Sequence, residues 1–273
     1  MIIGNREFDF NKHCYVMGIL NVTPDSFSDG GKWNDFDAAL AHVKEMIDDG
    51  ADIIDVGGES TRPGYTLLSD EEEIGRVVPI IRAIKENFDI PVSVDTYKSG
   101  VAKAAIEAGA DALNDIWGLK YDTEIAGVAA EYNVPVFLMH NRKEAVYENF
   151  MEDVLDDLEE SIKIAHNAGI PDDKIILDPG VGFGKTYENN LEVINEVDEI
   201  VGLGYPVLLA TSRKSVIGLT LDLPADERVE GTVATTVIGV MKGCGMVRVH
   251  DVKENVRAIR MTEAILKGGA ELG

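Results

Sequence analysis

Eight short apolar runs recur along this chain of 273 residues, and a polar residue stands at or just after the end of each. In chain order these residues are Asn21, Glu59, Asp95, Asn114, His140, Asp178, Ser212 and His250. Segments with helical periodicity separate the runs, which predicts alternating strands and helices. Strands joined in this way close into a (β/α)8 or TIM barrel, an α/β fold whose active sites lie at the carboxyl ends of the strands. The pattern therefore predicts a barrel with a polar site at one face.

The stretch KIILDPGVGFGK, residues 174–185, shows this pattern most clearly. Apolar residues lead into Asp178, after which Pro179 and three glycines interrupt the regular backbone. A short apolar run bounded by proline and glycine is typical of a buried parallel strand. Glycine lets the backbone lie close to a ligand because no Cβ stands between them. We interpret the stretch as a carboxylate at the end of the sixth strand, followed by a loop that contacts a ligand.

The predicted elements follow one another without a linker, so we expect a single domain over residues 1–273, with a short N-terminal β-hairpin that closes the barrel floor. Ser69 opens a capping-box pattern for the second helix, Gly109 and Gly169 are predicted helix ends, and Asp251 is expected to cap the last helix. Besides the sixth strand, predicted strands cover 15–22, 52–58, 91–95, 111–116, 134–140, 205–211 and 246–251. Besides the second and last helices, predicted helices cover 35–49, 98–109, 122–132, 150–167, 186–200 and 225–242.

The composition and net charge argue against several classes of protein. Acidic residues number 49 against 25 basic ones, and the net charge of −24 creates a field that repels nucleic acid and anionic membrane surfaces. Cys14 and Cys244 are too few for a disulfide framework, so we expect a reducing, cytoplasmic location. The amino terminus lacks the pattern of a secretory signal, and no apolar run is long enough to span a membrane.

The connections after the first and second strands are longer than is usual between a strand and a helix. The first is NVTPDSFSDGGKW, with polar side chains at Asn21, Thr23, Asp25, Ser26, Ser28 and Asp29. The second holds Thr61 and Arg62, and the arginine offers a planar, permanently charged fork suited to phosphate. We interpret both connections as lids over the site. The alternatives are a variable surface loop and a solvated surface arginine.

Three carboxylates and an amide are predicted on the third, fourth and sixth strands: Asp95, Asn114, Asp115 and Asp178. Carboxylates that point inward are costly unless a partner satisfies them. A zinc site would need a histidine cluster, which this set lacks. A flat heterocycle with several N–H donors fits better, such as a pterin, whose aminopyrimidinone edge matches a carboxylate bidentately, and Phe183 would cover the ring. Asp55 and Asp115 each have an alternative role, as a turn cap or as the partner of a nearby cation.

Two cationic segments follow the seventh and eighth strands. TSRKS, residues 211–215, presents Arg213 and Lys214, whereas VRVHD presents Arg248 and His250. Loops after these two strands are a frequent phosphate site in (β/α)8 barrels. Arg248 and His250 are two residues apart, so they point to the same side of a strand. A bound anion is therefore expected here, although a histidine alone is more often structural.

Seven segments of the chain, in this order, resemble the dihydropteroate synthase family. They are MGILNVTPDSFSDGG, DVGGESTRPG, VDTYK, NDI, DPGVGFGK, SRKSVIG and RVHDV, and they extend from Met17 to Val252. The first two are highly specific, whereas NDI and VDT would be weak alone. The resemblance implies a transferase of folate biosynthesis. Such an enzyme condenses 6-hydroxymethyl-7,8-dihydropterin diphosphate with 4-aminobenzoate, giving 7,8-dihydropteroate and pyrophosphate.

The resemblance also implies roles for the matched residues. The pterin would be held by Asp95, Asn114, Asp178 and Lys214, with Phe183 over the ring. The diphosphate would be held by Thr61, Arg248 and His250, with Arg62 nearby and with Asn21 as a ligand of Mg²⁺ bound to it. The 4-aminobenzoate subsite would be bordered by Phe27, Pro63 and Ser215. Asp25 is expected to stabilise the closed lids.

The implied reaction is SN1-like, with the diphosphate leaving before the amine attacks. The ring system delocalises the cation at the methylene, and a neutral arylamine needs no strong base. Alternatives are a folate-to-corrinoid methyltransferase, a non-catalytic pterin-binding paralogue and a Schiff-base aldolase that uses Lys214. The methyltransferase leaves the two long loops unexplained, and the paralogue predicts the loss of Asn21, Lys214 or Arg248.

The family is usually dimeric, so the resemblance implies a homodimer that acts on small molecules. The segment TVATTVIGVM, residues 232–241, is apolar nearly all round and is compatible with burial at a subunit contact. Packing inside the monomer would explain the same composition.

Overall fold

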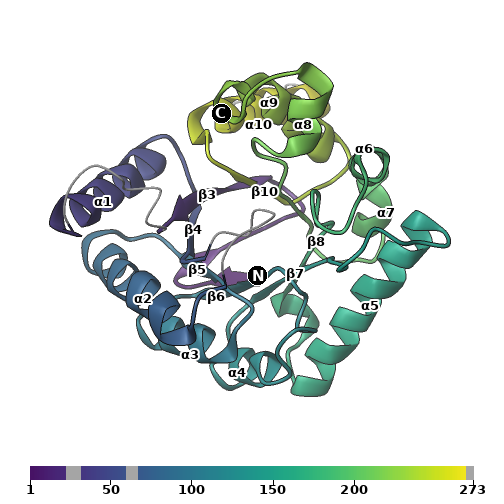
Figure 1. The fold of residues 1–273 in the computed structure, drawn as a ribbon. Helices are drawn as coiled ribbons and strands as arrows, with labels where there is room; N and C mark the ends of the chain where they lie inside the picture. Colours follow the sequence, from purple (N-terminus) through teal and green to yellow (C-terminus); the bar gives the residue numbers. More distant parts are fainter. Residues whose placement is uncertain (23–31, 60–66, 269–273) are drawn as a thin grey trace.

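A parallel sheet of eight strands forms the centre of the molecule in the computed structural model, which describes all residues except 23–31, 60–66 and 269–273 (Figure 1). The strands are ordered β8-β7-β6-β5-β4-β3-β10-β9, and a bridge between Leu177 and Val207 joins the two ends of this series. The strands are β3 (Tyr15–Asn21), β4 (Ile53–Gly57), β5 (Val92–Asp95), β6 (Ala112–Asp115), β7 (Val136–Met139), β8 (Ile175–Asp178), β9 (Leu208–Leu209) and β10 (Met246–Val249). The predicted (β/α)8 barrel is confirmed.

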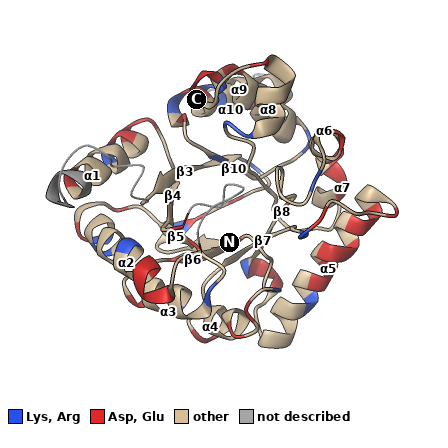
Figure 2. Ribbon diagram, viewed as in Figure 1, with Lys and Arg blue, Asp and Glu red and all other residues tan. Residues whose placement is uncertain are grey.

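Helices surround the sheet on its outer side, as Figure 1 shows. They are α1 (Lys32–Asp48), α2 (Asp70–Asn87), α3 (Ser99–Glu107), α4 (Ile125–Glu131), α5 (Phe150–Ala168), α6 (Tyr187–Asn195), α7 (Val197–Val201), α8 (Ser215–Leu221), α9 (Val229–Met241) and α10 (Val252–Leu266). Acidic residues are spread along these outer helices, as Figure 2 shows for α5. Among the described helices, none has the length and apolar character needed to cross a bilayer.

The inside of the barrel is apolar at its amino-terminal end. All strands of the sheet except β5 send one residue each into it, and these side chains pack together as Met17, Ile53, Ala112, Phe137, Ile176, Leu208 and Met246. The N-terminal hairpin, β1 (Ile2–Ile3) with β2 (Arg6–Glu7), adds Ile3 and Phe8 to this cluster. The predicted hairpin at the barrel floor is therefore confirmed, and it leaves the opposite end of the barrel for polar side chains.

Three elements differ from their predictions. The helix predicted over 186–200 is interrupted at Glu196, whose φ of −113° and ψ of 21° are not helical. The turn lets Val197 and Ile200 of α7 pack in the core. Strand β9 is shorter than predicted because Pro206 has no N–H to donate to the ladder, and only its carbonyl bonds to β8. Helix α8 was not predicted, since it follows directly from the cationic loop.

The local signals for helix ends mostly hold. Ser69 and Glu72 form both bonds of the predicted capping box, and Gly109 and Gly169 adopt positive φ after their helices. Asp251 occupies the predicted N-cap position of α10, but its side chain makes no capping bond. Its carboxylate instead accepts from the Arg213 guanidinium, at 3.0 Å from Nε and 2.5 Å from Nη2.

Two exposed glycines test how much the left-handed cap of α5 contributes to stability. A Cβ at Gly169 or Gly75 would have no atom within 4 Å, so only the backbone conformation differs between them. Gly169 has φ 95°, so Gly169→Ala should lower the free energy of unfolding by about 1–2 kcal/mol. Gly75 lies inside α2, so Gly75→Ala should raise it by about 0.5–1 kcal/mol. Urea unfolding of both variants measures the difference, and a destabilised Gly75→Ala would contradict this reasoning.

Candidate active site

Polar side chains meet at the carboxyl ends of β5, β6, β8 and β10. Asp95 is the last residue of β5 and lies opposite Asn114 of β6 in the parallel ladder. Asp178 is the last residue of β8, and Arg248 lies in β10. The eight-strand register brings together residues that are far apart in the sequence, as the strand-end pattern predicted.

The Arg248 guanidinium bonds two carboxylates at the centre of this site. Its Nε is 2.6 Å from Asp55 Oδ2, and its Nη2 is 2.8 Å from Asp95 Oδ2. Asp55 also accepts from the Asn114 amide at 3.1 Å and from the Ser93 hydroxyl. Asp55 is therefore the partner of a cation, which was one of its two predicted roles. Burial raises the pKa of Asp95 to about 7, even though Arg248 opposes the shift.

Asp178, Lys214 and Phe183 form the second half of the site. The Asp178 carboxylate accepts from the Gly180 N–H at 2.7 Å. Lys214 donates from Nζ to the Val181 carbonyl at 2.5 Å and lies 4.9 Å from the centre of the Phe183 ring. Burial lowers the pKa of Lys214 to about 8, with the Asp178 carboxylate opposing the shift. Burial likewise raises the pKa of Asp178, opposed by Lys214.

An apolar cluster borders these polar groups. Tyr97, Ile116 and Met139 are buried together, with Trp117 and Phe183 packed against them. A flat aromatic ring could lie against this surface while its polar edge meets the carboxylates. The sequence analysis assigned a role only to Phe183. The VDTYK and NDI segments contain Tyr97 and Ile116, but the segments alone do not show that these side chains meet those of Trp117 and Met139.

The remaining described residues of the predicted site lie around its rim. Asn21 ends β3, and a Cβ on Gly57 would be 3.7 Å from both Asn21 Oδ1 and Asp95 Oδ2. His250 lies just beyond β10, with Nδ1 2.9 Å from the Ser212 hydroxyl oxygen. Ser215 is exposed at the first turn of α8.

Asp115 turns away from the site. Its carboxylate accepts from the N–H groups of Trp117 and Leu119, both at 2.8 Å, so it caps the turn after β6. Burial raises its pKa to about 6. The turn-cap alternative is thus the correct one for this residue.

Five predicted site residues lie outside the described part of the chain: Asp25, Phe27, Thr61, Arg62 and Pro63. Within the described part, no group of three or more His, Cys, Asp or Glu side chains could hold a metal ion.

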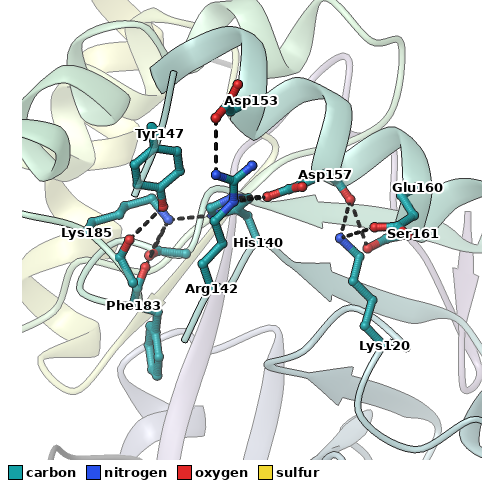
Figure 3. A network of polar contacts seen from close by, with 12 residues as sticks. Lys120, His140, Arg142, Tyr147, Asp153, Asp157, Glu160, Ser161, Phe183 and Lys185 are labelled. Carbon is teal, nitrogen blue, oxygen red and sulfur yellow. Dashed lines mark hydrogen bonds and ion pairs between the residues drawn. The ribbon is translucent and has the colours of Figure 1, made fainter. Parts of the chain in front are cut away.

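Two buried charged networks were missed. Glu59 accepts from the Tyr97 hydroxyl at 2.6 Å and from Lys98 Nζ at 2.9 Å, and Lys98 also bonds Glu73 at 2.7 Å. A second network joins His140 of the β7 end to Lys185 after β8 (Figure 3). Glu59 and His140 were noted as polar strand ends, which was the only signal in the sequence.

Comparisons with known proteins agree with this geometry. The family model described as pterin binding enzyme matches residues 17–250. The dihydropteroate synthase of Clostridium beijerinckii is 67% identical over 98% of this chain and 100% of its own length, and that of Bacillus subtilis is 58% identical over 97% and 93%. The crystal structure of dihydropteroate synthase from Clostridium difficile, in the presence of pteroic acid, has a TM-score of 0.93 at 52% identity, covering 95% of this chain and 99% of that one.

The barrel is thus that of a pterin-binding enzyme. Within this class the chain belongs to the dihydropteroate synthase family, the transferases expected from the seven segments.

Arg248 should be needed more at high pH than at low pH. The folded-state pKa of Asp95, about 7, lies above its ordinary value of 3.8. The stability from this group is therefore fully present below pH 3.8 and is lost as the pH rises through 7, and removing Arg248 raises that pKa further. Arg248→Met should lower the free energy of unfolding by about 3–5 kcal/mol at pH 8 and by less at pH 5. Denaturant unfolding at both pH values measures this, with the exposed Arg82→Met as a control whose cost should not depend on pH.

Proposed function

We propose that these residues carry out the family reaction in the following way. The enzyme condenses 6-hydroxymethyl-7,8-dihydropterin diphosphate with 4-aminobenzoate, giving 7,8-dihydropteroate and pyrophosphate on the way to tetrahydrofolate. The observation that carries the assignment of roles is the pairing of two buried carboxylates, Asp95 and Asp178, with Lys214 above the ring of Phe183. This arrangement is suited to a flat ring with a polar edge.

The pterin would be bound by both halves of the site. The carboxylates of Asp178 and Asp95 would accept hydrogen bonds from the polar edge of the ring, and the Asn114 amide would donate or accept there. The Phe183 side chain would cover the face of the ring. Lys214 would donate to a pterin acceptor while keeping its bond to the Val181 carbonyl. Buried polar groups of this kind favour a ligand that satisfies them all and reject one that does not.

The diphosphate would lie at the rim, near Arg248 and His250, with Thr61 and Arg62 as further ligands. The bond from the pterin methylene carbon to the diphosphate oxygen breaks first, and its electron pair leaves with pyrophosphate. The ring delocalises the cation, which the Asp95 and Asp178 carboxylates stabilise, and charge stabilisation of this kind often contributes more to catalysis than any other effect. The amine nitrogen of 4-aminobenzoate then forms the new bond to the methylene carbon and releases a proton.

Asn21 fits the role of a Mg²⁺ ligand. Its side-chain oxygen lies at the end of β3, on the same side of Gly57 as an Asp95 oxygen. Mg²⁺ is commonly held by one or two protein oxygens together with substrate phosphates. When bound there, the ion would neutralise charge that develops on the leaving pyrophosphate.

The 4-aminobenzoate subsite would be bordered by Ser215 on α8 and by Phe27 and Pro63. Asp25 would stabilise the closed arrangement over the cation and help to exclude water. Ser215 is exposed and lies next to Lys214, so a molecule beside it would be adjacent to the pterin.

We also propose that the chain acts as one domain over residues 1–273, as a homodimer, in the cytoplasm. Cys14 and Cys244 are both free and buried, which suits a reducing compartment. Helices α9 and α10 pack on each other and carry exposed apolar side chains, which we call the α9–α10 patch: Ile238, Met241, Met261 and Ile265. A subunit contact would remove this apolar area from water.

The reaction can be tested by measuring pyrophosphate release. Sustained release over many turnovers should require both the pterin diphosphate and 4-aminobenzoate, and chelation of Mg²⁺ should suppress it. Asp178→Asn should lower kcat/KM for the pterin substrate by about a hundredfold, because it removes a charge that stabilises the cation. The matched control is Asp111→Asn, at the floor end of the same barrel, where the carboxylate bonds Lys85 at 2.7 Å. A lack of 7,8-dihydropteroate formation when both substrates and Mg²⁺ are present would contradict the proposal.

The α9–α10 patch predicts the oligomeric state. Met241→Glu and Ile265→Glu place a charge on this patch, so each should convert the dimer to a monomer, as measured by light scattering after size exclusion. Val146→Glu serves as the control, because Val146 is equally exposed at 67% but lies outside α9 and α10. A wild-type protein that is monomeric at micromolar concentration would contradict the proposed dimer.

A further inference from the structure

Lys185 occupies the inside of the loop that follows β8. Its Nζ lies 2.6 Å from His140 Nδ1, 3.0 Å from the Gly180 carbonyl oxygen and 3.2 Å from the Phe183 carbonyl oxygen (Figure 3). An ammonium group has three N–H donors and no acceptor. The three partners therefore match its three donors, and two of them are the first and fourth residues of the loop 180–183.

Asp157 fixes the proton on the His140 ring. The Asp157 carboxylate oxygen lies 3.0 Å from His140 Nε2, and a carboxylate can only accept. The ring must then carry its proton on Nε2, which leaves Nδ1 as an acceptor for Lys185. Burial lowers the pKa of His140 to about 4, so the ring stays neutral near pH 7. The histidine is also bonded through its backbone N–H to the Asp178 carbonyl at 2.9 Å.

The same loop is pressed against the chain that follows β7. Gly180 and Gly184 have positive φ, and a Cβ on either would collide with the backbone of His140 or Arg142. Tyr147 closes the loop from the other side by donating to the Gly184 carbonyl at 2.6 Å. The loop therefore carries its two pterin-site groups, the Phe183 ring and the Val181 carbonyl that holds Lys214, on a backbone that Lys185 ties together.

We propose that Lys185 is a positioning residue for the bound pterin, acting through the loop 180–183, and that His140 and Asp157 hold its ammonium group in place. The proposal rests on the function given above, which puts the pterin beside Asp178 and Phe183. Lys185 itself bonds the backbone and the histidine, so it would set the geometry of the site without touching the reacting atoms. Nothing in the roles implied for the family motifs assigned this lysine.

The charge on Lys185 should then matter for binding. The charged groups that face it come from four elements: Asp178 of β8, Asp157 of α5, Lys214 before α8 and Arg142 after β7. Burial lowers the pKa of Lys185 to about 7, with Asp178 as the main opposing charge. A neutral amine has two N–H donors for the same three acceptors, so one of the three bonds that hold the loop and His140 together is lost as the pH rises through 7. Pterin affinity should fall over this range, and binding should be accompanied by proton uptake.

The experiment measures binding of 6-hydroxymethylpterin, which lacks the diphosphate and cannot react, by titration calorimetry in two buffers of different ionisation enthalpy. Lys185→Met should weaken binding by about tenfold and reduce the number of protons taken up. Asp95 and Lys214 also titrate near neutral pH, so the difference between variant and wild type isolates the contribution of Lys185. Lys120→Met is the matched control, because Lys120 bonds the Asp157 carbonyl at 2.6 Å and belongs to the same network without contacting the loop.

A second variant keeps the proposal testable if Lys185→Met does not fold. Asp157→Asn removes the carboxylate on the far side of His140 and leaves the loop itself unchanged. Because Asp157 raises the pKa of Lys185, its loss should move the pH at which pterin affinity falls downward by about one unit. An unchanged or higher midpoint would overturn the proposal.

The outcomes separate this inference from the function on which it rests. If the wild-type protein does not bind the pterin, the proposed function fails. If it binds, but Lys185→Met binds equally well with the same proton uptake, or Lys120→Met loses as much affinity, the positioning role fails and the function stands.

Discussion

The structure depends on one electrostatic constraint, which is that two carboxylates on neighbouring strands, one in the middle of β4 and one at the end of β5, lie close together inside the barrel. Asp55 and Asp95 would repel each other in a medium with little water, and the Arg248 guanidinium between them compensates both. Such a cluster is costly to bury and would be a weak way to stabilise a fold. The cluster instead serves the function, because it gives Asp95 a raised pKa and a fixed position beside the substrate.

The apolar floor makes this arrangement possible. Side chains from seven strands and the N-terminal hairpin fill one end of the barrel, so apolar packing is supplied there and the opposite end can hold polar side chains. In the loop after β8, too, contacts away from the ligand fix the groups that bind it. Lys185 and close contact with the β7 end hold the loop backbone, and this backbone carries Phe183 and Val181.

Features set by neighbouring residues could be predicted from the sequence, whereas features set by distant ones could not. The capping box of Ser69 depends on four consecutive residues, and strand-end polarity follows from the barrel itself. The N-cap position of Asp251 could be predicted, but not the bond from its carboxylate to Arg213, which lies 38 residues away and adopts a positive φ. The bond between His140 and Lys185 spans 45 residues and leaves no periodic trace. The sequence predicted both Asp55 and Asp115 in strands, and only the fold separates their roles, because Asp55 lies in the middle of β4 whereas Asp115 ends β6.

The tight contact between the β8 loop and the β7 end has a consequence for inhibitors. At Gly180 and Gly184 no larger residue fits, since their missing Cβ positions are taken by backbone atoms that cannot move aside. An inhibitor bound against the loop after β8 would contact a backbone surface that few single substitutions could change. Substitutions that weaken inhibitor binding would arise more readily at exposed positions such as Ser215. Inhibitors that contact only the loop after β8 would therefore be less sensitive to single resistance substitutions.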